Sequence, residues 1–244
     1  MEPTQQPAPA TAPKSGNLGI PVAIVIAGII IAGAVYLRGE PSKGADDQGF
    51  TAQNKKTTLR PVDATDHILG NPKADLVVIE YSDTECPFCK RFQGTMQQIM
   101  SDYGKDGKVA WVYRQMPLQQ LHSKAPKEAE ATECVAELGG NDKFWAYVDS
   151  IYETTNSNDS LDPAQLPILA AKIGIDAKAF DTCLSSGKYA QKIKASIAEG
   201  TLAAGTQATP FSVIVDKKGN TYPIEGAYPY ATLKPIIDGL LKGN

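Results

Sequence analysis

The chain has 244 residues, 42% of them hydrophobic, and carries 24 Lys and Arg against 27 Asp and Glu, for a net charge of −3. This length suits one large domain or two small ones, which can bury a core without crosslinks. So small a charge gives no electrostatic reason to expect nucleic acid as a partner. Four cysteines are too few for a disulfide scaffold, but their even number suits two pairs.

The first 37 residues divide into two parts. Residues 1–17 hold four prolines and few apolar groups, which predicts a disordered tail. Residues 18–37 contain twenty uncharged residues, enough for a helix that spans the hydrocarbon layer. We therefore expect a single N-terminal transmembrane helix. A cleaved signal peptide is the alternative, because Ala32-Gly33-Ala34 resembles a cleavage site.

The orientation of this span is set by two opposing arguments. Lys14 is the only basic residue before the span, whereas Arg38, Lys43, Lys55 and Lys56 follow it. The positive-inside rule therefore disfavours an extracytoplasmic C-terminal part. The thiol chemistry inferred below favours that side, and we give it precedence.

Residues 38–60 are polar and contain glycine, which predicts a flexible tether to a folded part that begins at about residue 61. A continuous apolar run at 75–80 predicts a strand buried on both faces. Helical spacing of apolar residues from Pro87 to Tyr103, with Gly104 as a stop, predicts a helix. Residues 108–114 read as a second strand, so the unit is strand, helix, strand.

From about 123 to 204 the patterns are helical throughout, whereas 211–226 read as two strands joined by a turn and 229–241 as a closing helix. The sequence thus predicts an α/β sheet domain, residues 61–122 and 205–244, interrupted by a helical domain, residues 123–204. Trp111, Trp145 and Tyr147 are expected in the core.

The sequence Cys86-Pro87-Phe88-Cys89 lies where the first predicted strand ends and the helix begins. Pro87 suits the first helical position, which places Cys86 at the positive end of the helix dipole. Such cysteines have lowered pKa values. We expect Cys86 to be the exposed nucleophile and Cys89, one turn further on, to be the buried resolving thiol.

Two alternatives for this motif are a metal site and a purely structural disulfide. A zinc site would need two further ligands, and the sequence offers only His67, His122, Cys134 and Cys183, none of them in a close-spaced pair. No metal and no cofactor are therefore expected. His122 precedes a predicted helix and is expected to have a structural role.

The chain resembles the DsbA-like thiol:disulfide oxidoreductases of the thioredoxin superfamily, particularly their membrane-anchored members. The resemblance covers about 62–242 and is carried by "ILGNPKADLVVIEYSDTECPFCKRF", "ATECVAELGGNDKFWAYVD", "FDTCLSSGKY" and "GTQATPFSVIVD". It implies a thioredoxin fold with an inserted helical domain, in agreement with the pattern above.

The resemblance also implies roles for individual residues. Cys86 corresponds to the nucleophile, Cys89 to the resolving cysteine and Pro210 to a cis-proline beside them. The backbone of Thr209 would then face an extended substrate. Glu80 corresponds to a buried acid that exchanges a proton with the resolving thiol; a strand-end glutamate facing water is the alternative.

The residues between the two cysteines, Pro87 and Phe88, are expected to face substrate and to tune the redox potential. The best-known oxidases of the family have histidine at the position of Phe88, so an equally oxidising potential does not follow. Cys134 and Cys183 lie on apolar helix faces and could be plain small hydrophobes. Relatives with a second, non-catalytic disulfide imply instead that these two cysteines are bonded.

Together these features predict a membrane-tethered oxidoreductase, with its catalytic domain outside the cytoplasm, that oxidises thiols of exported proteins. Its expected partners are those reduced proteins and a membrane redox partner that restores the active-site disulfide. The alternatives are a reductase or isomerase of the same fold, or a non-enzymatic module that binds peptides beside Pro210.

Overall fold

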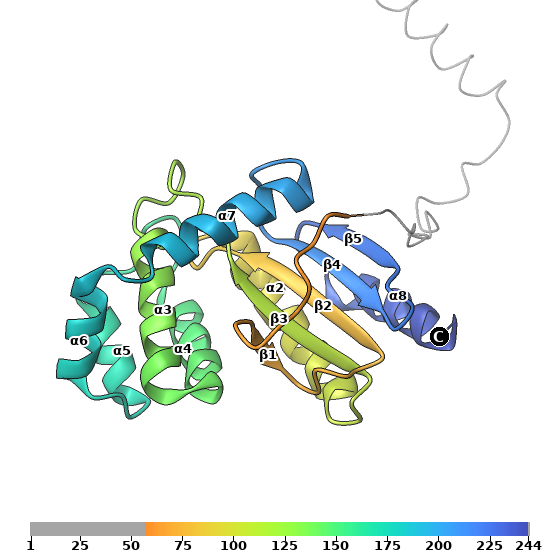
Figure 1. Ribbon diagram of the computed structural model, residues 1–244, viewed down its shortest axis with the longest axis horizontal. Coiled ribbons are helices and arrows are strands. Elements are labelled where there is room, and N and C mark those ends of the chain that lie inside the picture. The colour runs from red at the N-terminus through yellow and green to blue at the C-terminus, as the bar shows by residue number, and fades with distance from the viewer. Residues whose placement is uncertain (1–56, 244) are drawn as a thin grey trace, which may run out of the picture. The chain divides into compact units, whose positions relative to one another are not determined.

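The computed structural model describes residues 57–243, and its centre is a five-stranded mixed sheet in the order β1-β3-β2-β4-β5 (Figure 1). β2 and β3 are parallel, and every other neighbouring pair is antiparallel. The strands are β1 (His67–Leu69), β2 (Leu76–Ser82), β3 (Val109–Gln115), β4 (Phe211–Asp216) and β5 (Thr221–Glu225).

The helices fall into two groups along the chain. One connects β2 to β3 and one follows β5, whereas the others all lie between β3 and β4. In order they are α2 (Pro87–Ile99) with a π-helical turn (Met100–Gly104), α3 (Ala125–Gly139), α4 (Asn141–Thr154), α5 (Gln165–Lys172), α6 (Ala177–Ser186), α7 (Ala190–Ala204) and α8 (Tyr230–Gly243).

The two faces of the sheet pack against different helices because side chains alternate along each strand. Leu76 and Val78 of β2 pack on the face that α2, α4 and α8 cover. Ile79 and Tyr81 pack on the opposite face, with the end of α7. In Figure 1, α2 and α8 lie behind the sheet and α7 crosses in front of it.

α7 approaches the sheet closely at a glycine. A side chain at Gly200 would place its first carbon 2.7 Å from the ring of Tyr81 and 2.8 Å from the sulfur of Met116. No ordinary side chain fits there, since neither a buried aromatic ring on β2 nor the residue that follows β3 can withdraw without repacking the core. Gly200 therefore lets α7 lie directly on the sheet.

The helices between β3 and β4 have a core of their own. Tyr147 of α4 packs edge to face on Phe180 of α6, with their ring centroids 6.1 Å apart. A disulfide joins Cys134 of α3 to Cys183 of α6 across 49 residues of chain. The insertion is thus held together by apolar packing and by one covalent crosslink.

The predicted sheet with inserted helices is confirmed, as are the buried positions of Trp111, Trp145 and Tyr147. Two details differ. The α-helix that begins at Pro87 ends at Ile99, and the residues up to Gly104 form a wider turn. β1 was not predicted, because three half-buried residues are too few for a periodic pattern.

The predicted tail (1–17) and transmembrane helix (18–37) lie outside the described residues, as does the tether (38–60) up to residue 56. Among residues 57–243 no helix has the length and apolar character that a membrane span requires.

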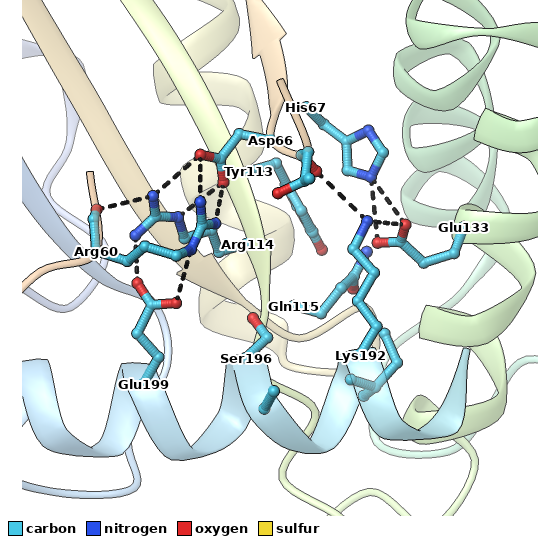
Figure 2. Close-up of a pocket in the computed structure, with 13 residues that line it drawn as sticks. Arg60, Asp66, His67, Tyr113, Arg114, Gln115, Glu133, Lys192, Ser196 and Glu199 are labelled. Atoms are coloured by element: carbon cyan, nitrogen blue, oxygen red, sulfur yellow. Dashed lines mark hydrogen bonds and ion pairs between the residues drawn. The ribbon is translucent and has the colours of Figure 1, made fainter. Parts of the chain in front are cut away.

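A network of charged side chains ties the segment before β1 to the sheet and to α7 (Figure 2). Arg114 of β3 binds both carboxylate oxygens of Asp66, at 3.0 and 3.1 Å, and also pairs with Glu199 of α7. Arg60 adds a contact of 2.6 Å to Asp66. The side chains of Arg114 and Asp66 are each only 2% exposed, so these charges depend on one another for solvation.

The same network lines a cavity of about 200 Å³. On its other side, Glu133 of α3 accepts from Lys192 at 2.5 Å and contacts His67 at 3.1 Å (Figure 2). The acids and bases at this cavity are paired with each other, which indicates a structural role in holding α3, α7 and β3 together.

We predict that Arg114→Met lowers the free energy of unfolding by about 3 to 5 kcal/mol, because it leaves the Asp66 carboxylate buried without its two-point partner. Urea unfolding measures this change. Lys108→Met is the control, since Lys108 pairs with Asp106 where both side chains are at least half exposed, and there we expect less than about 1 kcal/mol. Equal losses in the two variants would contradict the prediction.

We also predict that replacing both Cys134 and Cys183 with Ala lowers the free energy of unfolding by up to about 4 kcal/mol, because the crosslink closes a long loop in the unfolded chain. Guanidinium unfolding under non-reducing conditions measures it. Thr182→Ala, an exposed neighbour in α6, serves as the control. A loss below about 1 kcal/mol in the double variant would show that the crosslink adds little.

Candidate functional site

The two cysteines of the CPFC motif lie at the end of β2, where α2 begins. Cys86 has an extended backbone and precedes the first helical residue, Pro87, while its N–H donates to the carbonyl of Asp83 at 3.1 Å. Proline suits this position because its missing N–H would find no partner in the first turn. Cys86 therefore faces the free N–H groups of α2. Both cysteines are free thiols in this structure.

The expectation that Cys86 is exposed is wrong in degree, because the residue is only 5% exposed. The carbonyl of Thr209, from the loop before β4, lies 3.4 Å from its sulfur and accepts a hydrogen bond from the thiol. Thr209 is 123 residues away from Cys86 in the sequence, so local sequence patterns could not reveal that it lies over the Cys86 sulfur. Cys89 is completely buried, so Cys86 is the more accessible of the two.

The two sulfurs have opposite acidities. Hydrogen bonds to the Cys86 sulfur, first from the Cys89 thiol and then from the side chain of Thr209 and the amides of Cys89 and Phe88, outweigh burial and lower the pKa of Cys86 to about 6. Burial, together with that same hydrogen bond and the charge of Cys86, raises the pKa of Cys89 well above its ordinary value. At neutral pH the pair is one thiolate and one thiol.

Glu80 lies under this pair, inside the protein. It belongs to β2 and is wholly buried, so the alternative of a strand-end glutamate facing water is wrong. The indole of Trp111 donates to one carboxyl oxygen at 2.9 Å, and the other oxygen has no hydrogen-bond partner among the described residues. Burial raises the pKa of Glu80 to about 7 against the opposing effects of the Ser82 and Trp111 side chains. Its charge also acts on Cys89.

The other predicted site residues surround the cysteines. The Thr209–Pro210 peptide bond is cis, and Thr209 is half-buried beside Cys86. Pro87 is exposed, and Phe88 is 54% exposed with the guanidinium of Arg91 5.1 Å from its ring centre. The structure thus brings together all the residues predicted for catalysis and substrate contact, whereas Cys134 and Cys183 lie apart in the insertion.

Sequence reasoning missed the polar residues between β2 and Cys86. Asp83 and Glu85 are buried, and so is Glu128 of α3 beside them. Glu85 accepts hydrogen bonds from the Thr155 hydroxyl at the C-terminal end of α4 and from the amide of Leu161 in the loop that follows. The run "SDTE" reads as a solvated loop, and only its position between a buried strand and the cysteines could have signalled otherwise.

A metal role for these residues finds no geometric support. Within residues 57–243, no group of three or more His, Cys, Asp or Glu side chains is placed to hold a metal ion. His67 is engaged with Glu133, and His122 with Asp83.

Comparison with known proteins places this site in a family. A family model described as Thioredoxin matches residues 63–238. Among solved structures, Pseudomonas aeruginosa DsbA2 is 28% identical, with a TM-score of 0.62 over 75% of this chain and 98% of that one. Bacillus subtilis BdbD, 23% identical, shares the fold with a TM-score of 0.66 over 78% of this chain and 100% of that one.

Curated relatives are longer proteins. The Na(+)/H(+) antiporter NhaA 1 of Mycolicibacterium gilvum is 32% identical over 172 residues, which are 69% of this chain and 26% of the antiporter. The chain therefore spans about a quarter of the length of the curated relatives it matches.

The family model covers most of the chain, and the site has two cysteines of opposite acidity at a helix start beside a cis-proline. The chain belongs to the thioredoxin family, and its fold is similar to that of DsbA2.

Proposed function

We propose that the chain oxidises thiols of exported proteins through Cys86 and Cys89. The observation that carries the proposal is the difference between the two sulfurs, one lowered to a pKa of about 6 and the other raised by burial. A stable Cys86 thiolate favours the reduced form of the pair, and a pair that prefers to be reduced is a good oxidant of other thiols.

The reaction begins with Cys86 and Cys89 joined in a disulfide. A substrate thiolate attacks the sulfur of Cys86, the bond to Cys89 breaks, and Cys89 leaves with the electron pair. A second substrate thiolate then attacks the substrate sulfur of the mixed disulfide and releases Cys86 as a thiolate. The substrate has lost two electrons and the pair has gained them, so a redox partner must remove them before the next cycle.

Glu80 is proposed to supply the proton that Cys89 needs when it leaves. Its pKa of about 7 means that it is half protonated at neutral pH, and the charge of Glu80 acts on Cys89. A buried thiolate with no proton source would be a poor leaving group in this interior. Cys89 would return the proton to Glu80 when the disulfide forms again.

Three residues are proposed to contact the substrate. Thr209 offers backbone groups beside the Cys86 sulfur, to which an extended peptide could pair as an added strand. Pro87 and the exposed ring of Phe88 present an apolar surface on the other side of the sulfur. Pro210 fixes the direction of the Thr209 carbonyl.

We further propose that residues 18–37 anchor the catalytic part outside the cytoplasmic membrane, where a membrane partner would reoxidise it. The twenty uncharged residues of that segment support this, and so does the membrane transport function in the names of the curated relatives. The alternatives are a reductase and an isomerase that use the same site. In a reductase, electrons would flow from the cysteine pair to the substrate. In an isomerase, the electrons given to the substrate would return to the pair.

We predict that Cys86 in the reduced protein is alkylated with a half-maximal rate near pH 6, because only the thiolate reacts and the pKa of Cys86 is about 6. Below that pH the thiolate is lost and the rate falls. Cys89 should stay unmodified up to pH 8, as mass spectrometry of trapped peptides would show. Labelling of Cys89 at an equal or higher rate would contradict the assignment of the two roles.

We also predict that the protein oxidises a reduced two-cysteine peptide, and that Cys86→Ser abolishes this activity because no mixed disulfide can form. The reduction potential in glutathione buffers should be less negative than the value of about −270 mV for thioredoxin. Thr182→Ala, an exposed position of α6 that leaves the whole site in place, is the control and should keep the activity. A potential at or below that of thioredoxin would favour a reductase.

A further inference from the structure

His122 and Asp83 form a buried pair next to the reactive cysteine, and the function proposed above leaves them without a role. The imidazole Nδ1 of His122 lies 2.8 Å from a carboxylate oxygen of Asp83. His122 is 5% exposed and Asp83 1% exposed. The same oxygen of Asp83 accepts from the amide of Leu118 at 2.7 Å, and the other oxygen accepts from the amide of Glu85 at 2.8 Å.

Asp83 connects this pair directly to Cys86. The backbone carbonyl of Asp83 accepts from the N–H of Cys86 at 3.1 Å and from the hydroxyl of Tyr152 at 3.2 Å. The N–H of His122 in turn donates to the carbonyl of Leu118 at 2.9 Å. The backbone carbonyl of Asp83 binds the turn that carries Cys86, and its carboxylate binds Leu118 and His122. This one residue therefore connects the turn to the loop after β3.

His122 also brings a positive charge near the sulfur, beside the carboxylate of Asp83 that pairs with it. Burial lowers the pKa of His122, but the hydrogen bond and the charge of Asp83 outweigh it and raise that pKa above its ordinary value. The charge of Cys86 acts in the same direction. Interactions between charges are reciprocal, so a protonated His122 favours the Cys86 thiolate.

The acidic groups around His122 do not supply the positive charge that stabilises the Cys86 thiolate. Asp159, from the loop after α4, adds a negative charge, and its carboxylate is held by the amides of Ser123 and Lys124. Burial raises the pKa of Glu128 to about 8, so that carboxyl is largely protonated at neutral pH. Glu85, also buried, accepts from the Thr155 hydroxyl and from the amide of Leu161.

The motif itself brings no cation between the cysteines, where Pro87 and Phe88 stand. The next two residues are basic but otherwise engaged. Lys90 donates to the carbonyl of Thr155 at 2.5 Å, and Arg91 lies over the Phe88 ring.

We propose that His122, held as an imidazolium by Asp83, is a positioning residue that stabilises the Cys86 thiolate and fixes the turn that carries it. It thereby supplies from the loop after β3 the positive charge that the CPFC motif lacks. The inference rests on the proposed function only in assigning the reactive thiolate to Cys86.

The test is the titration of the Cys86 thiolate in the reduced protein, followed by its ultraviolet absorbance. His122→Asn keeps an amide donor where Nδ1 stands but removes the charge, so we expect the pKa of Cys86 to rise from about 6 by about one unit. One unit is a tenfold change and makes the reduction potential about 30 mV more negative. His122→Ala should raise the pKa at least as much.

His67→Asn is the matched control, because His67 also contacts a buried acid, Glu133, but belongs to the charged network of Figure 2. It should leave the Cys86 titration unchanged. Equal shifts in His67→Asn and His122→Asn, or no shift in His122→Asn, would overturn the proposal.

A second measurement needs no variant and remains decisive if His122→Asn fails to fold. The pKa of His122, followed by NMR, should be higher in the reduced protein than in the Cys86–Cys89 disulfide form, because coupling acts equally in both directions. The same value in both forms would refute the inference. Protein that shows the coupling but does not oxidise peptides would refute the proposed function and leave the role of His122 standing.

Discussion

The site depends on a hydrogen bond between two sulfurs one helical turn apart. The Cys89 thiol donates to the Cys86 sulfur, which stabilises one as a thiolate and keeps the other protonated. This asymmetry requires that one sulfur lies at the free N–H groups of α2 and the other inside the core. The extended backbone of Cys86, the proline after it and the burial of Cys89 between α2 and the sheet provide that arrangement.

The site also requires polar side chains in the otherwise apolar core beneath the two sulfurs. The alternation of β2 turns Glu80 and Ser82 toward α2, on the same face as Leu76 and Val78. Ser82 lies 3.0 Å from the hydroxyl of Tyr152 of α4, a helix of the insertion. The insertion therefore completes the interior of the site as well as covering it.

Sequence patterns correctly predicted the helices and strands whose position depends on neighbouring residues in the chain. Apolar spacing placed α2 and each inserted helix, and a continuous apolar run placed β2, because periodicity records which face is buried. Patterns could not show the contact between Cys86 and Thr209, the burial of Asp83 beside His122, or the pairing of Arg114 with Asp66 and Glu199. Each of these joins residues at least 39 positions apart, so only the folded chain reveals it. The motif thus identified the reacting atoms but not their surroundings.

The close approach of α7 at Gly200 has a mechanical consequence. This helix begins among the helices of the insertion, which the disulfide between Cys134 and Cys183 crosslinks, and ends five residues before Thr209. With no side chain to act as a spacer, its backbone rests on Tyr81, and Glu199 anchors it to Arg114. α7 thus connects the crosslinked insertion to the face of the sheet, and only a short segment of chain after its end is needed to bring the Thr209 carbonyl to the reactive sulfur.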